Sequence, residues 1–92
     1  MFLLREDTVM EMNTVNENDL FESTDLSLVS ALLCFGAVIE HVDRSAPRAN
    51  FSIHREKGLN ELVRAFFAHE LKVDPLVYFN CIREAKTRLY QD

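Results

Sequence analysis

Residues 37–54, AVIEHVDRSAPRANFSIH, determine the fold class expected for this chain. Polar and apolar residues alternate from Ala37 to Asp43 and again from Ala49 to His54, and both runs are rich in Val, Ile and Phe. Alternation with this composition predicts two β-strands, and Pro47 lies in the intervening turn. We therefore expect a β-hairpin in the middle of the chain.

A loop from Ser45 to Arg48 would set the register of this hairpin by pairing Val42 with Phe51. Val38 and Ile53 would then lie on the same face, which we expect to pack on helices because a two-stranded ribbon alone is only marginally stable. The opposite face would carry the remaining side chains: Ile39, His41, Asp43, Asn50, Ser52 and His54. A slip of one residue would exchange the faces, so the register is the least determined part of the prediction.

The hairpin leaves strand edges unpaired unless another segment covers them. Two segments are candidates for a third strand, namely Asp19–Glu22 and Phe2–Leu4. The sequence leaves both possibilities open.

The segment before the hairpin, STDLSLVSALLCFG at residues 23–36, predicts a largely buried helix. Ser23 or Thr24 is the expected N-cap, and Asp25 places a negative charge in the first turn. Gly36 is expected to end the helix in a left-handed conformation. The buried stripe is predicted to contain Leu28, Val29, Leu32, Leu33 and Phe35.

Two further helices are predicted after the hairpin. In GLNELVRAFFAHEL, residues 58–71, apolar residues recur at helical spacing, and Phe66 and Phe67 are expected to be buried. The next helix should begin with Asp74 as N-cap and Pro75 at its first position. Its inward stripe is predicted to consist of Phe79, Ile82, Ala85 and Leu89.

The order helix-strand-strand-helix-helix defines a small α+β domain with the hairpin packed on helices. A chain of 92 residues accommodates one domain at most, which we assign to residues 21–92. Residues 1–20 precede it as an acidic arm, since residues 1–27 have a net charge of −6 and the rest of the chain +1. The arm is expected to be flexible because residues 8–18 are polar and show no sustained period.

The chain contains two cysteines, Cys34 and Cys81, which are too few for a disulfide framework. Both fall in predicted helices among apolar residues, which is typical of buried thiols in a reducing, cytoplasmic environment. A disulfide between them would require Cα atoms within about 7 Å, a distance that the sequence does not reveal. We expect no membrane span and no signal peptide, because the apolar runs are too short and acidic residues follow Met1 closely.

Three stretches together carry a recognisable pattern: STDLSLVSALLCFG (residues 23–36), VDRSAPRANFSI (residues 42–53) and LVRAFFAHELKVDPLVYFNCIREAKTRLY (residues 62–90). The pattern resembles a family of small prokaryotic and phage-borne domains of unknown function. Its members have a Ser/Thr-Thr-Asp-Leu helix start, a hairpin and a final helix that opens with Val-Asp-Pro. The resemblance covers about residues 23–90 and implies no catalytic residue.

Neither metal binding nor catalysis is expected. No two candidate metal ligands have the close spacing of a metal motif, the candidates being His41, His54, His69, Cys34 and Cys81. His41 and Asp43 share a strand face with Ser52 opposite in the expected register, which resembles part of a catalytic triad. The chain has no Gly-rich turn to form an oxyanion hole, so we expect no enzyme activity and no cofactor.

A basic cluster surrounds the predicted hairpin and contains Arg44, Arg48, Arg55 and Lys57. A basic ribbon of this kind can enter a nucleic-acid groove or follow its backbone, so nucleic-acid binding by these four residues is one candidate function. Asp43 and Glu56 lie in the same cluster, and the net charge of −5 opposes phosphate approach. Cations at a sheet edge also prevent edge-to-edge aggregation, and this is the favoured interpretation.

The leading expectation is a small non-enzymatic protein-interaction or regulatory module, including the phage-encoded inhibitor type. The expected partner is a protein, whose identity the sequence does not indicate. Self-association through the hairpin edge is one route, and docking of the acidic arm on a basic surface is another.

Overall fold

The computed structural model describes residues 19–91. Within this range the elements follow one another as β2 (Leu20–Ser23), α1 (Leu26–Leu33), β3 (Ile39–Asp43), β4 (Asn50–His54), α2 (Leu59–Phe67) and α3 (Pro75–Tyr90). The fold is α+β, and the predicted order of helix, two strands and two helices is confirmed, with β2 added before the first helix. Most of the predicted arm, including the candidate strand Phe2–Leu4, lies outside the described residues.

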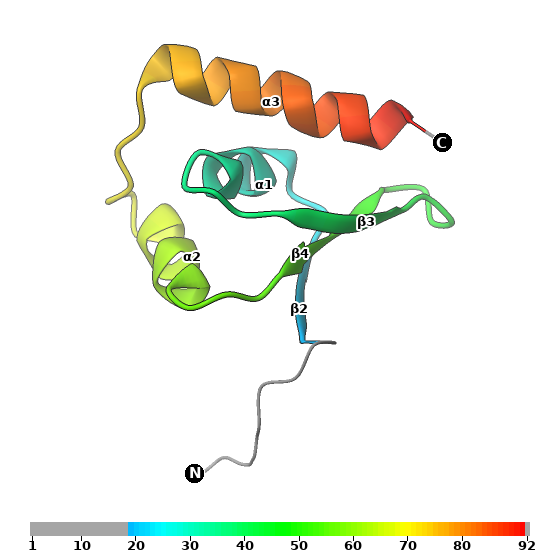
Figure 1. Ribbon diagram of the computed structural model, residues 1–92, viewed down its shortest axis with the longest axis horizontal. Coiled ribbons are helices and arrows are strands. Elements are labelled where there is room, and N and C mark those ends of the chain that lie inside the picture. Colours follow the sequence, from blue (N-terminus) through cyan, green and yellow to red (C-terminus); the bar gives the residue numbers. More distant parts are fainter. Residues whose placement is uncertain (1–18, 92) are drawn as a thin grey trace, which may run out of the picture.

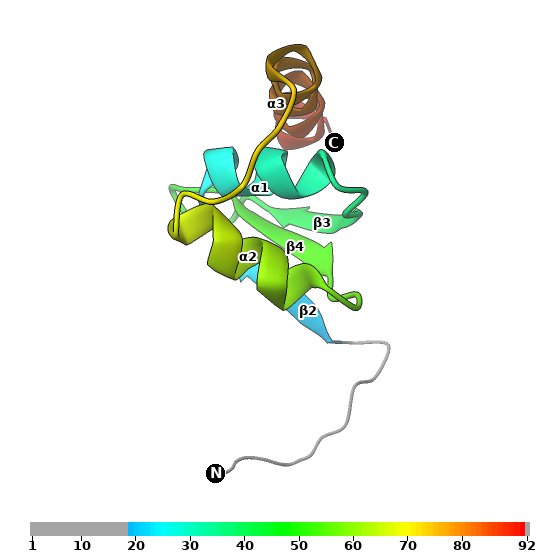
Figure 2. The same cartoon turned by 90° about the vertical axis from the view of Figure 1, so that its left-hand side faces the viewer.

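Helix α1 lies at the centre of the molecule, between the sheet and α3 (Figure 1). Helix α3 runs along the side of α1 that faces away from the sheet, and α2 packs beside α1 (Figure 2). Because α1 is covered on more than one side, every residue from Leu28 to Leu32 is buried. This confirms the prediction of a largely buried first helix, but the predicted burial of Phe35 was wrong, because Phe35 lies beyond the end of α1 and is 46% exposed.

The sheet is antiparallel, and its strand order is β2-β4-β3. Strand β4 is therefore the central strand, with Ile53 opposite Phe21 on one side and opposite Ile39 on the other. Strand β2 contains most of Asp19–Glu22, which was one of the two candidates for a third strand. This pairing covers the edge of β4 that an isolated hairpin would expose.

The hairpin register agrees with the prediction near the turn and differs from it at the start of β3. Val42 pairs with Phe51 as expected, but the pairing shifts between Ile39 and His41. Such a β-bulge inserts one extra residue and reverses the alternation of side chains that precede it. Ile39 is consequently buried, whereas Val38 is 49% exposed, so the predicted faces of these two residues were wrong.

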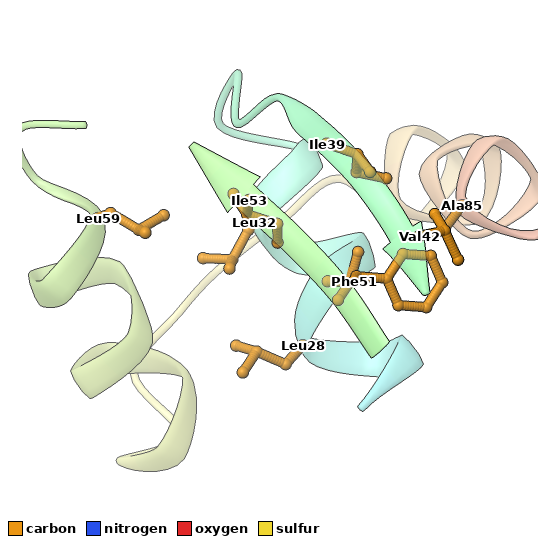
Figure 3. Close-up of a cluster of buried hydrophobic side chains, with 9 residues drawn as sticks. Leu28, Leu32, Ile39, Val42, Phe51, Ile53, Leu59 and Ala85 are labelled. Carbon is orange, nitrogen blue, oxygen red and sulfur yellow. The ribbon is translucent and has the colours of Figure 1, made fainter. Parts of the chain in front are cut away.

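The hydrophobic core lies between β3, β4 and α1 and extends to α2 and α3. Phe51 and Ile53 are essentially inaccessible, and they pack in one cluster with Leu28 and Leu32 of α1. Figure 3 shows Val42 and Phe51 of the sheet on the side of this cluster where α3 contributes Ala85. The buried partners explain why a hairpin that is marginal by itself is stable here.

Aspartate side chains cap the N-termini of α1 and α3. Asp25, rather than the expected Ser23 or Thr24, is the N-cap of α1, and its carboxylate accepts hydrogen bonds from the backbone N–H groups of Ser27 (3.0 Å) and Leu28 (3.3 Å). The Ser27 hydroxyl also donates to Asp25, and this bond is the main reason why the pKa of Asp25 is lowered. Asp74 caps α3 with Pro75 at the next position, as predicted.

Two helices end at a residue with positive φ. Gly36 has φ 91°, and the N–H of Ala37 donates to the carbonyl of Leu32, so the predicted left-handed end of α1 is confirmed. The corresponding residue after α2 is His69, with φ 63°, and the N–H of Glu70 donates to the carbonyl of Ala65. A histidine thus occupies a position that favours glycine.

The predicted inward faces of α2 and α3 were partly wrong. Phe67 is 61% exposed and Phe79 is 55% exposed, whereas Phe66 and Ile82 are half-buried. In α2, the stripe turns away from the core at its last turn, where Phe66 contacts Phe67 edge to face. In α3, the buried residues are the small ones, Cys81 and Ala85, because close contact with α1 leaves little space between the two helices.

Candidate interaction surface

The four cations of the predicted nucleic-acid interface do not form one cluster. Arg44 and Arg48 lie in the turn before β4, whereas Arg55 and Lys57 follow the last residue of that strand. The five residues of β4, at about 3.4 Å per residue, separate the two pairs by roughly 17 Å. A cluster in the sequence is therefore divided between two ends of the sheet.

Arg44 is engaged by α3. Its Nη1 donates hydrogen bonds to the main-chain carbonyls of Leu89 (3.0 Å) and Arg88 (3.4 Å). The last carbonyls of a helix have no intrahelical partners and carry a partial negative charge. Arg44 therefore stabilises the C-terminus of a helix that lies more than 40 residues further along the chain, a role that the sequence pattern did not reveal.

Arg55 contacts residues at the beginning of β2 and in α2. Its Nε lies 3.1 Å from Oδ1 of Asp19, and its Nη1 donates to Oδ1 of Asn60. The guanidinium also lies over the ring of Phe21, 5.5 Å from the ring centroid. These contacts attach the beginning of β2 to the segment after β4, while Arg48 and Lys57 are exposed.

The residues that resembled part of a catalytic triad do not assemble into one. His41 lies opposite Ser52 as predicted, but Ser52 is only 5% exposed while His41 is exposed. Oδ1 of Asp43 accepts a hydrogen bond from the N–H of Ser45 (2.9 Å), which lowers the pKa of Asp43. The carboxylate of Asp43 is thus bound to the backbone of the turn, and the buried hydroxyl of Ser52 is inaccessible to a substrate.

The candidate metal ligands are dispersed. Within residues 19–91, no group of three or more His, Cys, Asp or Glu side chains is placed to hold a metal ion. Nδ1 of His54 lies 3.4 Å from Oε2 of Glu56, but this contact lacks hydrogen-bond geometry and leaves the buried nitrogen unsatisfied. His69 is exposed at the end of α2.

The two cysteines lie together, although they are 47 positions apart in the sequence. Cys34 follows the last residue of α1, and Cys81 lies on the buried face of α3. Burial and a hydrogen bond with the Cys81 thiol raise the pKa of Cys34 to about 11. Both side chains are free thiols.

The outer edge of β3 is approached by α3. Nη1 of Arg88 donates a hydrogen bond of 3.1 Å to the main-chain carbonyl of Ile39. Since β4 is paired on both sides, β3 is the strand of the hairpin that forms an outer edge of the sheet. Arg88 satisfies one polar group of this edge and thus reduces its capacity to pair with another strand.

A surface on α3 was missed by the sequence analysis. Leu76, Phe79 and Tyr90 are 68%, 55% and 80% exposed, respectively, and they recur along the side of the helix opposite the buried Cys81 and Ala85. We call this surface the outer α3 face; it comprises Leu76, Phe79, Arg83, Lys86 and Tyr90. The spacing of these residues at three, four, three and four positions was the signal for a second stripe, since helical neighbours on one face have this separation.

The outer α3 face combines apolar side chains with cations. The guanidinium of Arg83 lies 6.0 Å from the ring centroid of Phe79, and Lys86 is exposed one turn further on. Large exposed apolar side chains with cations among them on one face are typical of a protein-binding surface.

A hollow of about 170 Å³ adjoins the N-terminal end of α3. It lies between the end of α1 and the segment that leads into α3; its lining residues are Cys34, Phe35, Lys72, Val73, Asp74 and Val77. Phe35 and Val77 are both 46% exposed. The hollow is large enough for one side chain of a partner.

No family model, curated protein or solved structure matches this chain. The resemblance to small phage-borne domains therefore stays a prediction. In the part of the chain that the structure describes, no helix has the length and apolar character needed to cross a membrane.

Proposed function

We propose that this protein is a small non-enzymatic interaction or regulatory module that binds a partner protein through the outer α3 face. The observation that carries the proposal is the exposure of Leu76, Phe79 and Tyr90 on one side of a helix whose other side is buried against the domain. Aromatic and large aliphatic side chains of this kind supply most of the energy of protein interfaces when a partner removes them from water.

The partner that fits this surface is an amphipathic helix with an acidic border. Arg83 and Lys86 lie on the face between Phe79 and Tyr90, so a partner needs apolar side chains opposite the apolar residues and carboxylates opposite the two cations. In an antiparallel pairing of two copies of this face, Arg83 at its centre would lie against its own equivalent. Charge complementarity therefore favours a different, acidic partner over self-association through α3.

The non-enzymatic character of the proposal is supported by the separation of the candidate catalytic groups. The hydroxyl of Ser52 is buried, and the carboxylate of Asp43 is engaged by Ser45. A phage-encoded inhibitor is consistent with a small domain that carries an exposed face of this kind.

Nucleic-acid binding by the hairpin is supported less well. Arg44 and Arg55 donate to groups of the protein itself, and Arg48 and Lys57 lie near opposite ends of β4. A gel-shift series with short oligonucleotides at low salt tests this alternative. We expect no shift; micromolar binding that is abolished by Arg48→Ser would favour the alternative, because a phosphate contact depends on the cation.

The proposal can be tested with a synthetic amphipathic helix that carries Leu along one face and Glu beside it. We expect the full-length protein to bind this peptide, and Phe79→Ser to weaken binding at least about tenfold because Phe79 is the large aromatic side chain between Leu76 and Arg83 on the face. A peptide of the same pattern with Lys in place of Glu should bind more weakly, and the difference should decrease with added salt.

Val38→Ser is the matched control, because Val38 is 49% exposed and lies outside the outer α3 face. It should leave peptide binding unchanged, and both variants should keep the parent melting temperature to within a few degrees. Absence of binding to the acidic peptide, or equal binding by Phe79→Ser and the parent, would overturn the proposal.

A further inference from the structure

The two cysteines of the chain form a dithiol pair between α1 and α3. Cys34 is the C-cap of α1, and Cys81 is 9% exposed on the inner face of α3. Val77, one turn before Cys81 on α3, lines the same hollow as Cys34, and the Cys81 thiol is near enough to raise the pKa of Cys34. Two cysteines that meet across a helix–helix contact, with no other cysteine in the chain, leave one intramolecular pairing.

Small residues surround the pair and allow the two helices to approach closely. On α1, Ala31 is buried one turn before Cys34, and on α3, Ala85 is buried one turn after Cys81. The hydroxyl of Tyr78 also donates to the carbonyl of Ser27 (3.1 Å), which joins the same two helices further along. Close backbone approach is the geometric condition for a disulfide.

The two thiols differ in their access to solvent. Cys34 is half-buried and lines the hollow of about 170 Å³ at the end of α3, whereas Cys81 is buried and does not line it. A reagent that enters the hollow therefore meets Cys34 first. Because of this difference in accessibility, we assign Cys34 as the attacking thiol and Cys81 as the resolving thiol.

We propose that Cys34 and Cys81 form a reversible intramolecular disulfide in exchange with a low-molecular-weight disulfide such as glutathione disulfide. The thiolate of Cys34 attacks one sulfur of the oxidant, whose S–S bond breaks and releases one glutathione, which takes up a proton. The thiolate of Cys81 then attacks Sγ of Cys34 and displaces the second glutathione. The two protein thiols lose two electrons, and one glutathione disulfide is reduced to two glutathione molecules.

The reaction has a characteristic pH dependence. Burial and the hydrogen bond with Cys81 hold the pKa of Cys34 at about 11, so the thiolate is a small fraction of the total at neutral pH. The rate of the first step should therefore rise about tenfold for each pH unit below that pKa. The exchange is slow at neutral pH and responds to sustained oxidising conditions.

The disulfide would join α3 to α1 and so attach the helix that carries the outer α3 face to the centre of the domain. The inference does not rest on the proposed function, because it requires only the two thiols and the contact between their helices. A disulfide between two cysteines 47 positions apart also restricts the conformations of the unfolded chain, so the folded state and the disulfide should stabilise each other.

The proposal is tested by equilibrating the purified full chain in glutathione redox buffers near pH 8.5, once in the folded state and once in denaturant. Unreacted thiols are alkylated, and the products are identified by intact mass and peptide mapping. We expect a Cys34–Cys81 disulfide in a monomer, with an equilibrium constant at least about tenfold larger in the folded state than in denaturant. A constant that is equal or smaller in the folded state would overturn the proposal.

Two variants test the order of the steps. Cys81→Ala should stop at a mixed disulfide between glutathione and Cys34, because the resolving thiol is absent. Cys34→Ala should leave Cys81 largely unmodified, and modification of Cys81 at the rate seen for Cys34 would contradict the assigned order. If a variant does not fold, the comparison of folded and denatured wild-type protein still decides the proposal.

Discussion

Arg44, at the end of β3, donates hydrogen bonds from Nη1 to the main-chain carbonyls of Leu89 and Arg88 at the C-terminus of α3. Arg88 in turn donates from its own Nη1 to the carbonyl of Ile39 in β3. The arginine next to β3 thus binds main-chain carbonyls of α3, and the arginine of α3 binds a main-chain carbonyl of β3. This exchange attaches the C-terminal end of α3 to β3, while Leu76, Phe79 and Tyr90 of the outer α3 face are exposed.

Arg44→Ser is expected to lower the free energy of unfolding by about 0.5–1.5 kcal/mol, the usual contribution of a hydrogen bond to a helix-end carbonyl. Arg48→Ser is the matched control in the same turn and should change stability by less than about 0.5 kcal/mol, because Arg48 is exposed. Urea unfolding measures both values. Equal effects would show that Arg44 does not stabilise α3.

Phe51→Ala is expected to cost about 3–5 kcal/mol, which is enough to unfold a domain of this size, because Phe51 is 2% exposed in the main cluster. Phe67→Ala should cost less than about 1 kcal/mol, since Phe67 is 61% exposed. Thermal unfolding followed by circular dichroism separates the two outcomes. Similar losses for both variants would contradict the burial of Phe51 and the exposure of Phe67.

His69→Gly is expected to raise the free energy of unfolding by about 1 kcal/mol, because His69 has φ 63° and only glycine adopts this conformation without steric cost. Gly36→Ala is the opposite control. Gly36 has φ 91°, and an added Cβ would meet no atom within 4 Å, so its expected loss of about 1 kcal/mol is purely conformational. A decrease in stability for His69→Gly would mean that contacts of the imidazole outweigh the backbone cost.

The free energy of unfolding is expected to decrease with rising pH in the alkaline range because of Cys34. Its pKa is raised from 9.0 to about 11 by burial and by the hydrogen bond with Cys81, so the folded state holds the proton more tightly than the unfolded state. The contribution to stability is complete below about pH 9 and is lost as the pH rises towards about 11. The melting temperature of the reduced wild-type protein should therefore decrease more over this pH range than that of the Cys34→Ser variant, in which the thiol is absent. Parallel melting curves for the two proteins would contradict this assignment.

The sequence by itself determined the local structure. The alternation around the turn at Pro47 predicted the hairpin, Asp74 and Pro75 predicted the start of α3, and Gly36 predicted the end of α1. These features depend on neighbouring residues and on steric rules that hold in any fold. The α+β class followed from the same signals, because the period of the apolar residues changes between the helices and the strands.

The tertiary structure decided which side of each element is buried and what the polar groups contact. The bulge between Ile39 and His41 reversed one strand face, and the close packing of α3 on α1 selected Cys81 and Ala85 instead of Phe79 for the interior. The same packing brought Cys34 to Cys81, and Arg44 to the end of α3. Such outcomes depend on the distance between elements that are far apart in the sequence, and local periodicity does not encode that distance.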